Sequence, residues 1–245
     1  MNSGGLRSAI TRLIKAIQAP SPPADDGLRE SIVLQLRSPH RALAQQALKT
    51  ALERGWVRDG TLCGSNMIGV SFYRYDLNHA NLREAVLAEA KLAGVNLFNA
   101  NLHQADLRGA NLTGAVLNSA NLTNANLEGT YFIESDLRGA DLRGAWMVGA
   151  RFGNADLYGA KLNDWQVIHA EVLCGAVMPN GARYDGRLRL RGDLELASFL
   201  GINLKATADM AAFYNVPHET YVEGQLWADR YLDRLRLDVA QRYQS

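Results

Sequence analysis

A five-residue repeat runs through the middle of the sequence and limits what this chain can fold into. Between Ala105 and Gly129, Leu recurs at every fifth position, and a small residue, Ala, stands two places before each Leu. An α-helix turns about 100° per residue, so residues five apart scatter around its axis and bury nothing together. On a β-strand, residues five apart point to opposite faces. The chain must therefore bend once per repeat and return each Leu to one shared interior, which is the arrangement of a solenoid.

The repeat is long and keeps its register. Its centres run from Leu62 to Leu162 at 21 consecutive positions, of which 16 are Leu and the others are Phe or Met. Departures from the small residue gather in the first repeats, as expected for terminal units. After Leu162 the register falters, and residues 172–181 fit the pattern better when shifted by one.

The pattern Ala-(Asp/Asn)-Leu-x-x resembles the signature of pentapeptide-repeat proteins. The resemblance implies a β solenoid, specifically a right-handed quadrilateral β-helix, in which each side is one pentapeptide and each coil contains four. It also implies that the central residue and the small residue point inward. The family often ends its helix with a turn similar to Gly175–Pro179, so we expect the solenoid to end near Asn180.

Three segments follow from this reading. Residues 60–180 form the predicted β-helix. Residues 1–59 have helical patterns, interrupted by a Pro-rich linker at 19–27, because Pro lacks a backbone donor and restricts the residue before it. Residues 181–245 again have helical patterns. We expect α-helical caps at both ends, since the terminal coils would otherwise expose apolar side chains and unpaired backbone groups.

Groups suited to catalysis or metal binding do not converge in this pattern. Neighbours along one face of the coil differ by 20 residues, and no two of the five His residues have that spacing. Cys63 and Cys174 are more than five coils apart, too far for a disulfide at about 4.8 Å per coil. The glycines two places after the centre suit corners of the coil. We therefore expect no enzyme activity, no cofactor and no metal.

A row of amides also follows the spacing of 20. Asn81, Asn101 and Asn121 are expected to stack on one face. Stacked Asn side chains can hydrogen-bond to one another along the solenoid. A structural ladder is the favoured interpretation, and a row that recognises a ligand is the alternative.

The most informative surface signal is apolar. Outward positions are mostly polar, but apolar pairs flank the centres Met147 and Phe132, which lie on neighbouring faces one coil apart. Around one corner these pairs could form a single exposed patch, and further apolar residues lie along the same face as the first pair. Such patches usually mark a protein partner, although a terminal helix of the same chain would explain them equally well. The candidate protein-binding residues are Tyr131, Ile133, Trp146, Val148, Ile68 and Val86.

The N-terminal segment predicts a basic amphipathic helix before the Pro-rich linker. Residues 6–18 could dock on the chain's own solenoid, on a second subunit or on an anionic membrane surface. Docking on protein is the favoured interpretation. The residues of this predicted docking helix are Leu6, Ile10, Leu13, Ile14 and Ile17.

Charge bears on an activity known in the resembled family, in which some members mimic DNA and bind DNA gyrase. Mimicry needs a strongly negative surface, because it must satisfy a site built for phosphates. Residues 60–180 hold 11 acidic and 8 basic side chains, which is a weak excess. Nucleic-acid binding is also disfavoured, because the loosely helix-turn-helix-like stretch 208–224 places Glu219 and Glu223 where phosphates would lie.

These observations predict a non-catalytic protein–protein interaction scaffold. Its partner is another protein or a second copy of this chain. The alternatives are a DNA-mimic regulator of gyrase or topoisomerase, and a membrane-surface adaptor acting through the first helix. No apolar run reaches about 18 residues and the start of the sequence has no signal-peptide pattern, so we expect a cytoplasmic protein.

Overall fold

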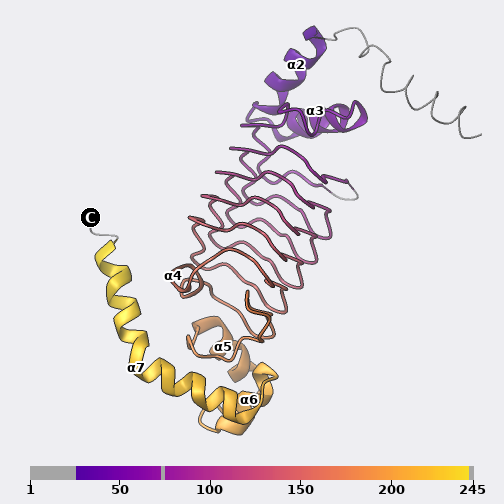
Figure 1. Ribbon diagram of the computed structural model, residues 1–245. Helices are drawn as coiled ribbons and strands as arrows, with labels where there is room; N and C mark the ends of the chain where they lie inside the picture. Colours follow the sequence, from indigo (N-terminus) through magenta and orange to yellow (C-terminus); the bar gives the residue numbers. More distant parts are fainter. Residues whose placement is uncertain (1–25, 73–74, 243–245) are drawn as a thin grey trace, which may run out of the picture.

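The computed structural model describes residues 26–72 and 75–242. The repeats coil into a long solenoid with helices at both ends (Figure 1). The predicted docking helix, with Leu6, Ile10, Leu13, Ile14 and Ile17, lies outside the described residues.

Parallel β-bridges join successive coils at a spacing of 20 residues, which is four pentapeptides. The N–H of Asn101 donates to the carbonyl of Ala80 at 2.9 Å, and the carbonyl of Asn101 accepts from Leu82 at 2.8 Å. The neighbouring Leu102 donates to the carbonyl of Asn121 in the following coil at 2.7 Å, so each side of a coil bonds to the coils on both sides of it. Within residues 26–72 and 75–242 the bridges stay isolated and extend into no longer strand. One column of bridged residues is Asn81, Asn101, Asn121, Asp141 and Lys161.

Each side of the coil ends in a turn that needs a left-handed residue. This residue stands two places after the centre, as Gly114 with φ 63° and Glu84 with φ 59° show. The N–H of Ala85 then closes the turn on the carbonyl of Leu82 at 3.1 Å. The predicted corner position of glycine is confirmed, since glycine adopts this conformation without steric strain.

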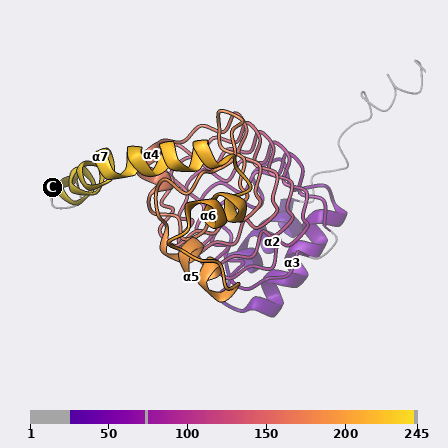
Figure 2. The same ribbon diagram turned by 90° about the horizontal axis from the view of Figure 1, so that it is seen from below.

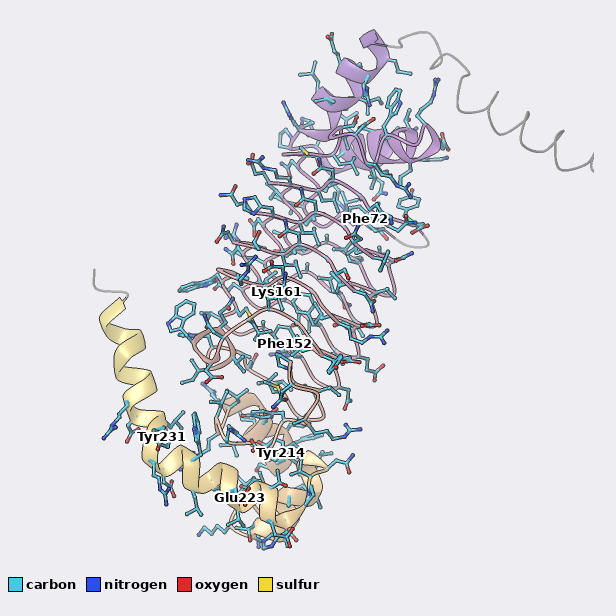
Figure 3. All side chains as sticks on the ribbon, in the orientation of Figure 1. Phe72, Phe152, Lys161, Tyr214, Glu223 and Tyr231 are labelled. Carbon is cyan, nitrogen blue, oxygen red and sulfur yellow. The ribbon has the colours of Figure 1, made fainter. Side chains whose placement is uncertain are left out.

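The interior of the solenoid is apolar and continuous. The centres from Leu62 to Leu157 are all buried, as is nearly every small residue two places before them. Phe132 and Phe152 stack inside the solenoid with ring centroids 5.0 Å apart (Figure 3 labels Phe152). Where a hydroxyl replaces Ala, it bonds to backbone: Ser135 donates to the carbonyl of Phe132 at 2.7 Å. The predicted inward positions are confirmed.

A short helix interrupts the last coils and explains the lapse in register. Helix α4 (Asp164–Val167) begins in a capping box between Asn163 and Gln166. The buried Gln166 amide donates to the carbonyl of Ala145 at 3.2 Å, in place of a regular coil contact. The coil gains one residue, because Arg151 now pairs with Val172 at a spacing of 21. The predicted shift by one is confirmed, whereas the helix that causes it was not predicted.

Two helices precede the first coil: α3 (Arg41–Glu53) lies across it, and α2 (Asp26–Leu36) packs on α3 and projects beyond it (Figure 1). The side-chain amide of Gln45 in α3 pairs with Ser71 in both directions, accepting from its N–H at 3.1 Å and donating to its carbonyl at 3.0 Å. The carbonyl of Leu36 accepts from Asn66 at 2.6 Å. These groups occupy the positions that a preceding coil would fill.

Three helices follow the last coil. The chain turns back after Val177, which pairs antiparallel with Arg183. Helices α5 (Arg191–Phe199) and α6 (Thr207–Tyr214) then lie across the end of the solenoid, and α7 (His218–Arg242) extends to one side (Figures 1 and 2). Tyr214 is buried among these helices (Figure 3).

The predicted amide ladder is present. Asn101 donates to the side-chain oxygen of Asn81, and Asn121 donates to that of Asn101, each at 3.3 Å. Each of these Asn residues also accepts a backbone N–H two residues further on, as from His103 at 3.1 Å. The amides are engaged with one another and with backbone, which supports the structural interpretation.

Candidate protein-interaction surface

The candidate apolar residues on the solenoid fall into separate surroundings. Trp146 and Val148 lie on the column that runs from Asn66 through Val86, whereas Tyr131 belongs to the column of Arg151. The four residues that flank Phe132 and Met147, called here the corner residues, are half-buried, and so is Val86. They are Tyr131, Ile133, Trp146 and Val148. Ile68 is 45% exposed and lies in the coil of Asn66, which is separated from Trp146 by the coils of Val86, Asp106 and Asn126.

Trp146 packs against residues of the α4 insertion. Its ring lies 6.5 Å from that of Trp165 and 6.4 Å from that of His169, measured between centroids. The Nδ1 atom of His169 lies 2.7 Å from the carbonyl of Trp165, which ties the two residues together across the helix. A terminal helix was one explanation for the apolar residues on this face. In the structure, the side chains that contact Trp146 come instead from the insertion in the last coils.

Tyr131 packs under a charged pair. The guanidinium of Arg151 lies 5.1 Å above the Tyr131 ring and bonds to the carboxylate of Glu171 at 2.8 Å. The Glu171 hydrogen bond, opposed by burial, raises the pKa of Arg151. A cation over an aromatic face contributes about 0.5–1 kcal/mol at such exposed sites. This ring is therefore partly covered by a polar layer.

Ile133 lines a groove between the last coils and α5. The groove encloses about 390 Å³, and its walls include Val172, Cys174 and Leu196. Ile133, Gly153 and Cys174 stand at the same place in three successive coils. Gly153 has no side chain, so the groove is deepest between the other two. A Cβ at Gly153 would meet Val172 at 3.6 Å, within ordinary contact. Arg151, Glu171 and Glu195 also line this groove, so Ile133 meets a recess with both apolar and charged walls.

The outer side of α5 carries the most exposed apolar residues of this region. Leu196, Phe199 and Leu200 stand at helical spacings of three and four, so they share one stripe. Phe199 is 87% exposed and Leu200 is 58% exposed. We call Leu196, Phe199 and Leu200 the α5 patch, which meets the groove at Leu196. Contiguous exposed apolar groups of this kind mark interaction sites more often than scattered ones do.

A buried carboxylate fixes α5 on the last coil. Asp193 is fully buried, and its Oδ1 accepts the backbone N–H groups of Leu173 at 2.9 Å and Cys174 at 3.0 Å. These are N–H groups for which no further coil supplies carbonyls. Gly192 allows the close approach, since a Cβ there would lie 2.4 Å from the carbonyl oxygen of Glu171.

The electrostatics of this contact are those of a desolvated acid. Burial raises the pKa of Asp193 to about 6, although both backbone hydrogen bonds favour its ionised form. Its second oxygen has no hydrogen-bond partner among the described residues. Burial, and then the Asp193 carboxyl, raises the pKa of the Cys174 thiol to about 11. Cys174 is therefore a thiol at neutral pH, which does not suit nucleophilic chemistry.

A second cavity lies between α4 and α7. It encloses about 330 Å³ and is lined by Val167, Arg187 and Trp227, among others. Arg187 bonds to the buried Asp185 carboxylate at 2.6 Å, and its guanidinium lies 5.5 Å from the Trp227 ring. These charges neutralise each other, so the cavity presents no uncompensated group from this pair.

Several Asp carboxylates on the solenoid are paired with Arg side chains. Arg108 bonds to Asp106 and Arg143 bonds to Asp141, each at 2.6 Å. Each Arg stands two residues after its Asp. Hydrogen bonds from Arg108 and Arg143 lower the pKa values of Asp106 and Asp141. The charges on these faces are thus locally compensated.

Residues 26–72 and 75–242 contain no group of three or more His, Cys, Asp and Glu placed to hold a metal ion. Over the same residues, no helix has the length and apolar character needed to cross a bilayer. Cys63 and Cys174 are both free thiols.

Phe199 and Leu200 are not among the residues predicted to bind a partner. Residues 181–245 have a helical pattern, and the spacing of Leu196, Phe199 and Leu200 is the signal that could have identified them. That spacing predicts an apolar stripe but not whether the stripe faces the solenoid. The structure places Ala197 and Asp193 inward instead, which leaves the stripe outside.

Comparisons with known proteins agree with the geometry. A model of the family of pentapeptide repeats matches in eight copies, over residues 65–104, 96–133 and 135–165. A comparison with curated proteins finds no match.

Solved structures give further matches. The chain is similar to HetL, a pentapeptide repeat protein involved in heterocyst differentiation regulation from the cyanobacterium Nostoc sp. strain PCC 7120. Identity is 29% and the TM-score 0.37, over 49% of this chain and 60% of HetL. It is similar to the pentapeptide repeat protein Rfr23 from the cyanobacterium Cyanothece 51142, with 38% identity and a TM-score of 0.34, over 34% of this chain and 56% of Rfr23. The chain thus spans less than two thirds of either protein.

A weaker match concerns antibiotic resistance. The chain is similar to QnrB1, a plasmid-mediated fluoroquinolone resistance protein, with 19% identity and a TM-score of 0.25, over 58% of this chain and 88% of QnrB1. A likeness of this size carries no argument about activity.

Proposed function

We propose that this chain, a pentapeptide-repeat protein, is a non-catalytic scaffold that binds another protein through the α5 patch and the adjoining groove. The observation that carries the proposal is the exposure of Phe199 and Leu200 beside a groove floored by Gly153. Exposed aromatic and aliphatic side chains next to a recess are the usual anchors of a protein interface.

The proposal includes the finer architecture. We take the solenoid to be the right-handed quadrilateral form, with residues 1–59 and 181–245 as segments whose helices cap residues 60–180. Gln45 at the first coil and Asp193 at the last support the capping role, because each supplies side-chain oxygen to backbone N–H groups of a terminal coil. The caps supply hydrogen-bond partners to the backbone groups of the terminal coils, so that these groups do not pair with another chain and extend the solenoid.

The charges on the solenoid bear on which surface binds the partner. On the solenoid, Asp106 and Asp141 are each paired with an Arg side chain. That pairing argues against the DNA-mimic alternative, which needs free negative charge at phosphate-like spacing. We also propose a cytoplasmic protein, in keeping with the free thiols of Cys63 and Cys174.

The test compares two apolar surfaces of the same chain. The immobilised protein is incubated with extract of the source cell, and retained proteins are quantified by mass spectrometry. The double variant Phe199→Asp, Leu200→Asp should lose a protein that the wild type retains. Phe98→Asp is the matched control, because Phe98 is 43% exposed next to Asn96, whose column reaches Val177 only after four further bridges. Equal retention by all three proteins would contradict the proposed surface.

A further inference from the structure

The cavity between α4 and α7 has walls from three parts of the chain. It encloses about 330 Å³, within the range of about 300–1,000 Å³ that is usual for small-molecule sites. In both views α7 leaves the end of the solenoid on the side where α4 lies (Figures 1 and 2). The α4 side supplies Asp164 and Val167, the turn after the last coil supplies Met178 and Arg183, and α7 supplies Trp227. The cavity is therefore formed by tertiary packing rather than by one helix.

Close packing holds α7 in place as one wall. A Cβ at Gly224 would lie 2.7 Å from the carboxylate of Asp185, so a larger residue there would push α7 away. Arg189, which follows the turn, donates to Gln225 at 2.8 Å and to Asp229 at 2.6 Å. These contacts fix the α7 wall without occupying the cavity.

Arg187 presents a donor edge that is already oriented. The carboxylate of Asp185, which is 3% exposed, accepts from Nε of Arg187 at 2.9 Å and from Nη2 at 2.6 Å. This pairing uses one edge of the planar guanidinium, which has five N–H donors in all. The other edge, formed by Nη1 and the second N–H of Nη2, has no acceptor among the described residues. Because Arg187 lines the cavity, this edge can bind a second carboxylate there through two hydrogen bonds.

The inner part of the cavity is apolar. Val167, Tyr184 and Leu188 line it, and each is 5% exposed or less. Leu162 is half-buried and adds to the same lining. Burying an apolar group against these side chains is favourable, because it removes apolar surface from water. A ligand should therefore combine an apolar body with the charged group that Arg187 binds.

Two further charges line the cavity, Arg183 and Asp164, and both residues are exposed. Arg183 donates to the carbonyl of Gly175 at 3.2 Å, and neither charge forms a salt bridge with a described residue. Hydrogen bonding to Asp185, opposed by burial, raises the pKa of Arg187, and the carboxylate of Asp164 adds a smaller rise. Asp164 therefore lies within electrostatic reach of Arg187. The unpaired cation and the unpaired anion match the carboxylate and the ammonium of a zwitterion.

From these observations, we propose that this cavity binds a free amino acid with an apolar side chain. Its carboxylate bonds to Arg183 and to the open edge of Arg187, its ammonium bonds to Asp164, and its side chain packs on Val167 and Leu188. The ligand is neutral overall, and so are the two Arg and two Asp residues of the lining taken together. The proposal is independent of the α5 patch, which contributes nothing to this lining.

The test follows the indole N–H signal of Trp227 by NMR. The full chain is labelled with ¹⁵N and titrated separately with leucine, isoleucine, valine, methionine and phenylalanine, and Trp227→Phe identifies the signal. We expect at least one of these amino acids to shift the Trp227 signal saturably. The signal of Trp56, at the opposite end of the solenoid (Figure 1), should not move. No saturable shift of Trp227 with any of the amino acids would overturn the proposal.

One substitution and a matched control test the carboxylate contact. Arg183→Ala removes an exposed guanidinium and should weaken binding about tenfold or more, as expected for hydrogen bonds to a charged group. Arg191→Ala should leave the affinity unchanged, because Arg191 is 87% exposed and lies outside the cavity lining. Arg187 is retained in every variant, because its loss would leave Asp185 buried without a partner. Equal effects of Arg183→Ala and Arg191→Ala would overturn the proposed contact.

The ammonium contact is tested by removing one charge at a time. Asp164→Asn should weaken binding of the amino acid about tenfold. The analogue of the same amino acid in which hydrogen replaces the amino group should bind the wild type more weakly than the amino acid does, and its binding should not depend on Asp164. An analogue that binds the wild type as tightly as the amino acid would overturn the zwitterionic ligand in favour of a simple carboxylate.

Discussion

Asp193 and Leu173 are 20 residues apart in sequence, and the side-chain oxygen of one accepts the backbone N–H of the other at 2.9 Å. Within the solenoid, a backbone carbonyl of the next coil fills this position, as Asn101 does for Leu82. A buried side chain has therefore replaced a whole coil at the point where the repeat stops. The replacement also places α5, and with it the α5 patch.

The stability of this contact should depend on pH. Burial raises the pKa of Asp193 to about 6 in the folded chain, against about 3.9 for an unperturbed Asp. Between these values the folded state binds more protons than the unfolded state, so its stability falls as pH rises from 4 to 6. The decrease should be about 3 kcal/mol at most, from about 1.4 kcal/mol per pH unit.

The variant Asp193→Asn isolates this effect. Asn does not titrate, so the variant lacks the loss of stability that Asp193 causes in the wild type between pH 4 and pH 6. The unfolding free energy of the variant should therefore rise relative to that of the wild type as pH increases through this window. Denaturant unfolding at pH 4, 5, 6 and 7 gives the measurement. A difference that stays constant would contradict the raised pKa. The paired acids Asp106 and Asp141 have lowered pKa values, so they act in the opposite direction and cancel in the comparison.

The first coil should depend on the amide of Gln45. Gln45→Ala leaves the N–H and carbonyl of Ser71 without their side-chain partners. We expect a loss of about 0.5–1.5 kcal/mol for each hydrogen bond, the usual net contribution, because Ser71 is half-buried and water can partly replace the lost partner. Hydrogen exchange of the Ser71 amide should accelerate, whereas that of Asn121, in the middle of the solenoid, should not change. Unchanged protection at Ser71 would show that the Gln45 amide does not hold this edge.

Two glycines in helices should respond oppositely to alanine. At Gly192 a Cβ would clash with Glu171 and Val172, so Gly192→Ala should loosen α5 and destabilise the chain by about 1–3 kcal/mol, as overpacking does. At Gly27 a Cβ meets nothing within 4 Å, so Gly27→Ala should be neutral or stabilise α2 by up to about 1 kcal/mol. Thermal unfolding distinguishes the two. Similar melting temperatures would contradict the close approach of α5.

Trp146 and Ile133 should differ in what they affect. Trp146 packs on Trp165 and His169, so Trp146→Ala should lower the unfolding free energy by about 1–3 kcal/mol and leave partner binding intact, because a half-buried ring contributes less than a fully buried one. Ile133 lines the groove, so Ile133→Ala should weaken binding with a smaller loss of stability. The reverse outcome would return the binding role to the Trp146 face.

Periodicity allowed the solenoid to be predicted almost residue by residue. The alternation of Leu and Ala determined which side chains are buried, and the spacing of 20 predicted the ladder of Asn81, Asn101 and Asn121. Each of these depends only on neighbours at a fixed distance along the chain. The shift by one after Leu162 was visible for the same reason.

Contacts made outside the repeat could not be predicted in this way. Trp165, which contacts Trp146, belongs to an insertion that is visible in the sequence only as a loss of register. The role of Asp193 depends on how α5 packs on the last coil. Exposure of Phe199 depends on which side of α5 faces the solenoid. Helical spacing groups residues on one side of a helix, but tertiary packing decides which side is buried.

Site-specific crosslinking shows whether another protein binds at the α5 patch. A photoreactive phenylalanine analogue is placed at position 199 in living cells, and the same analogue at position 98 serves as the control. The proposal predicts a discrete crosslinked product at position 199, containing another protein or a second copy of this chain, and none of that mass at position 98. No product at position 199, or the same product at both positions, would contradict the account.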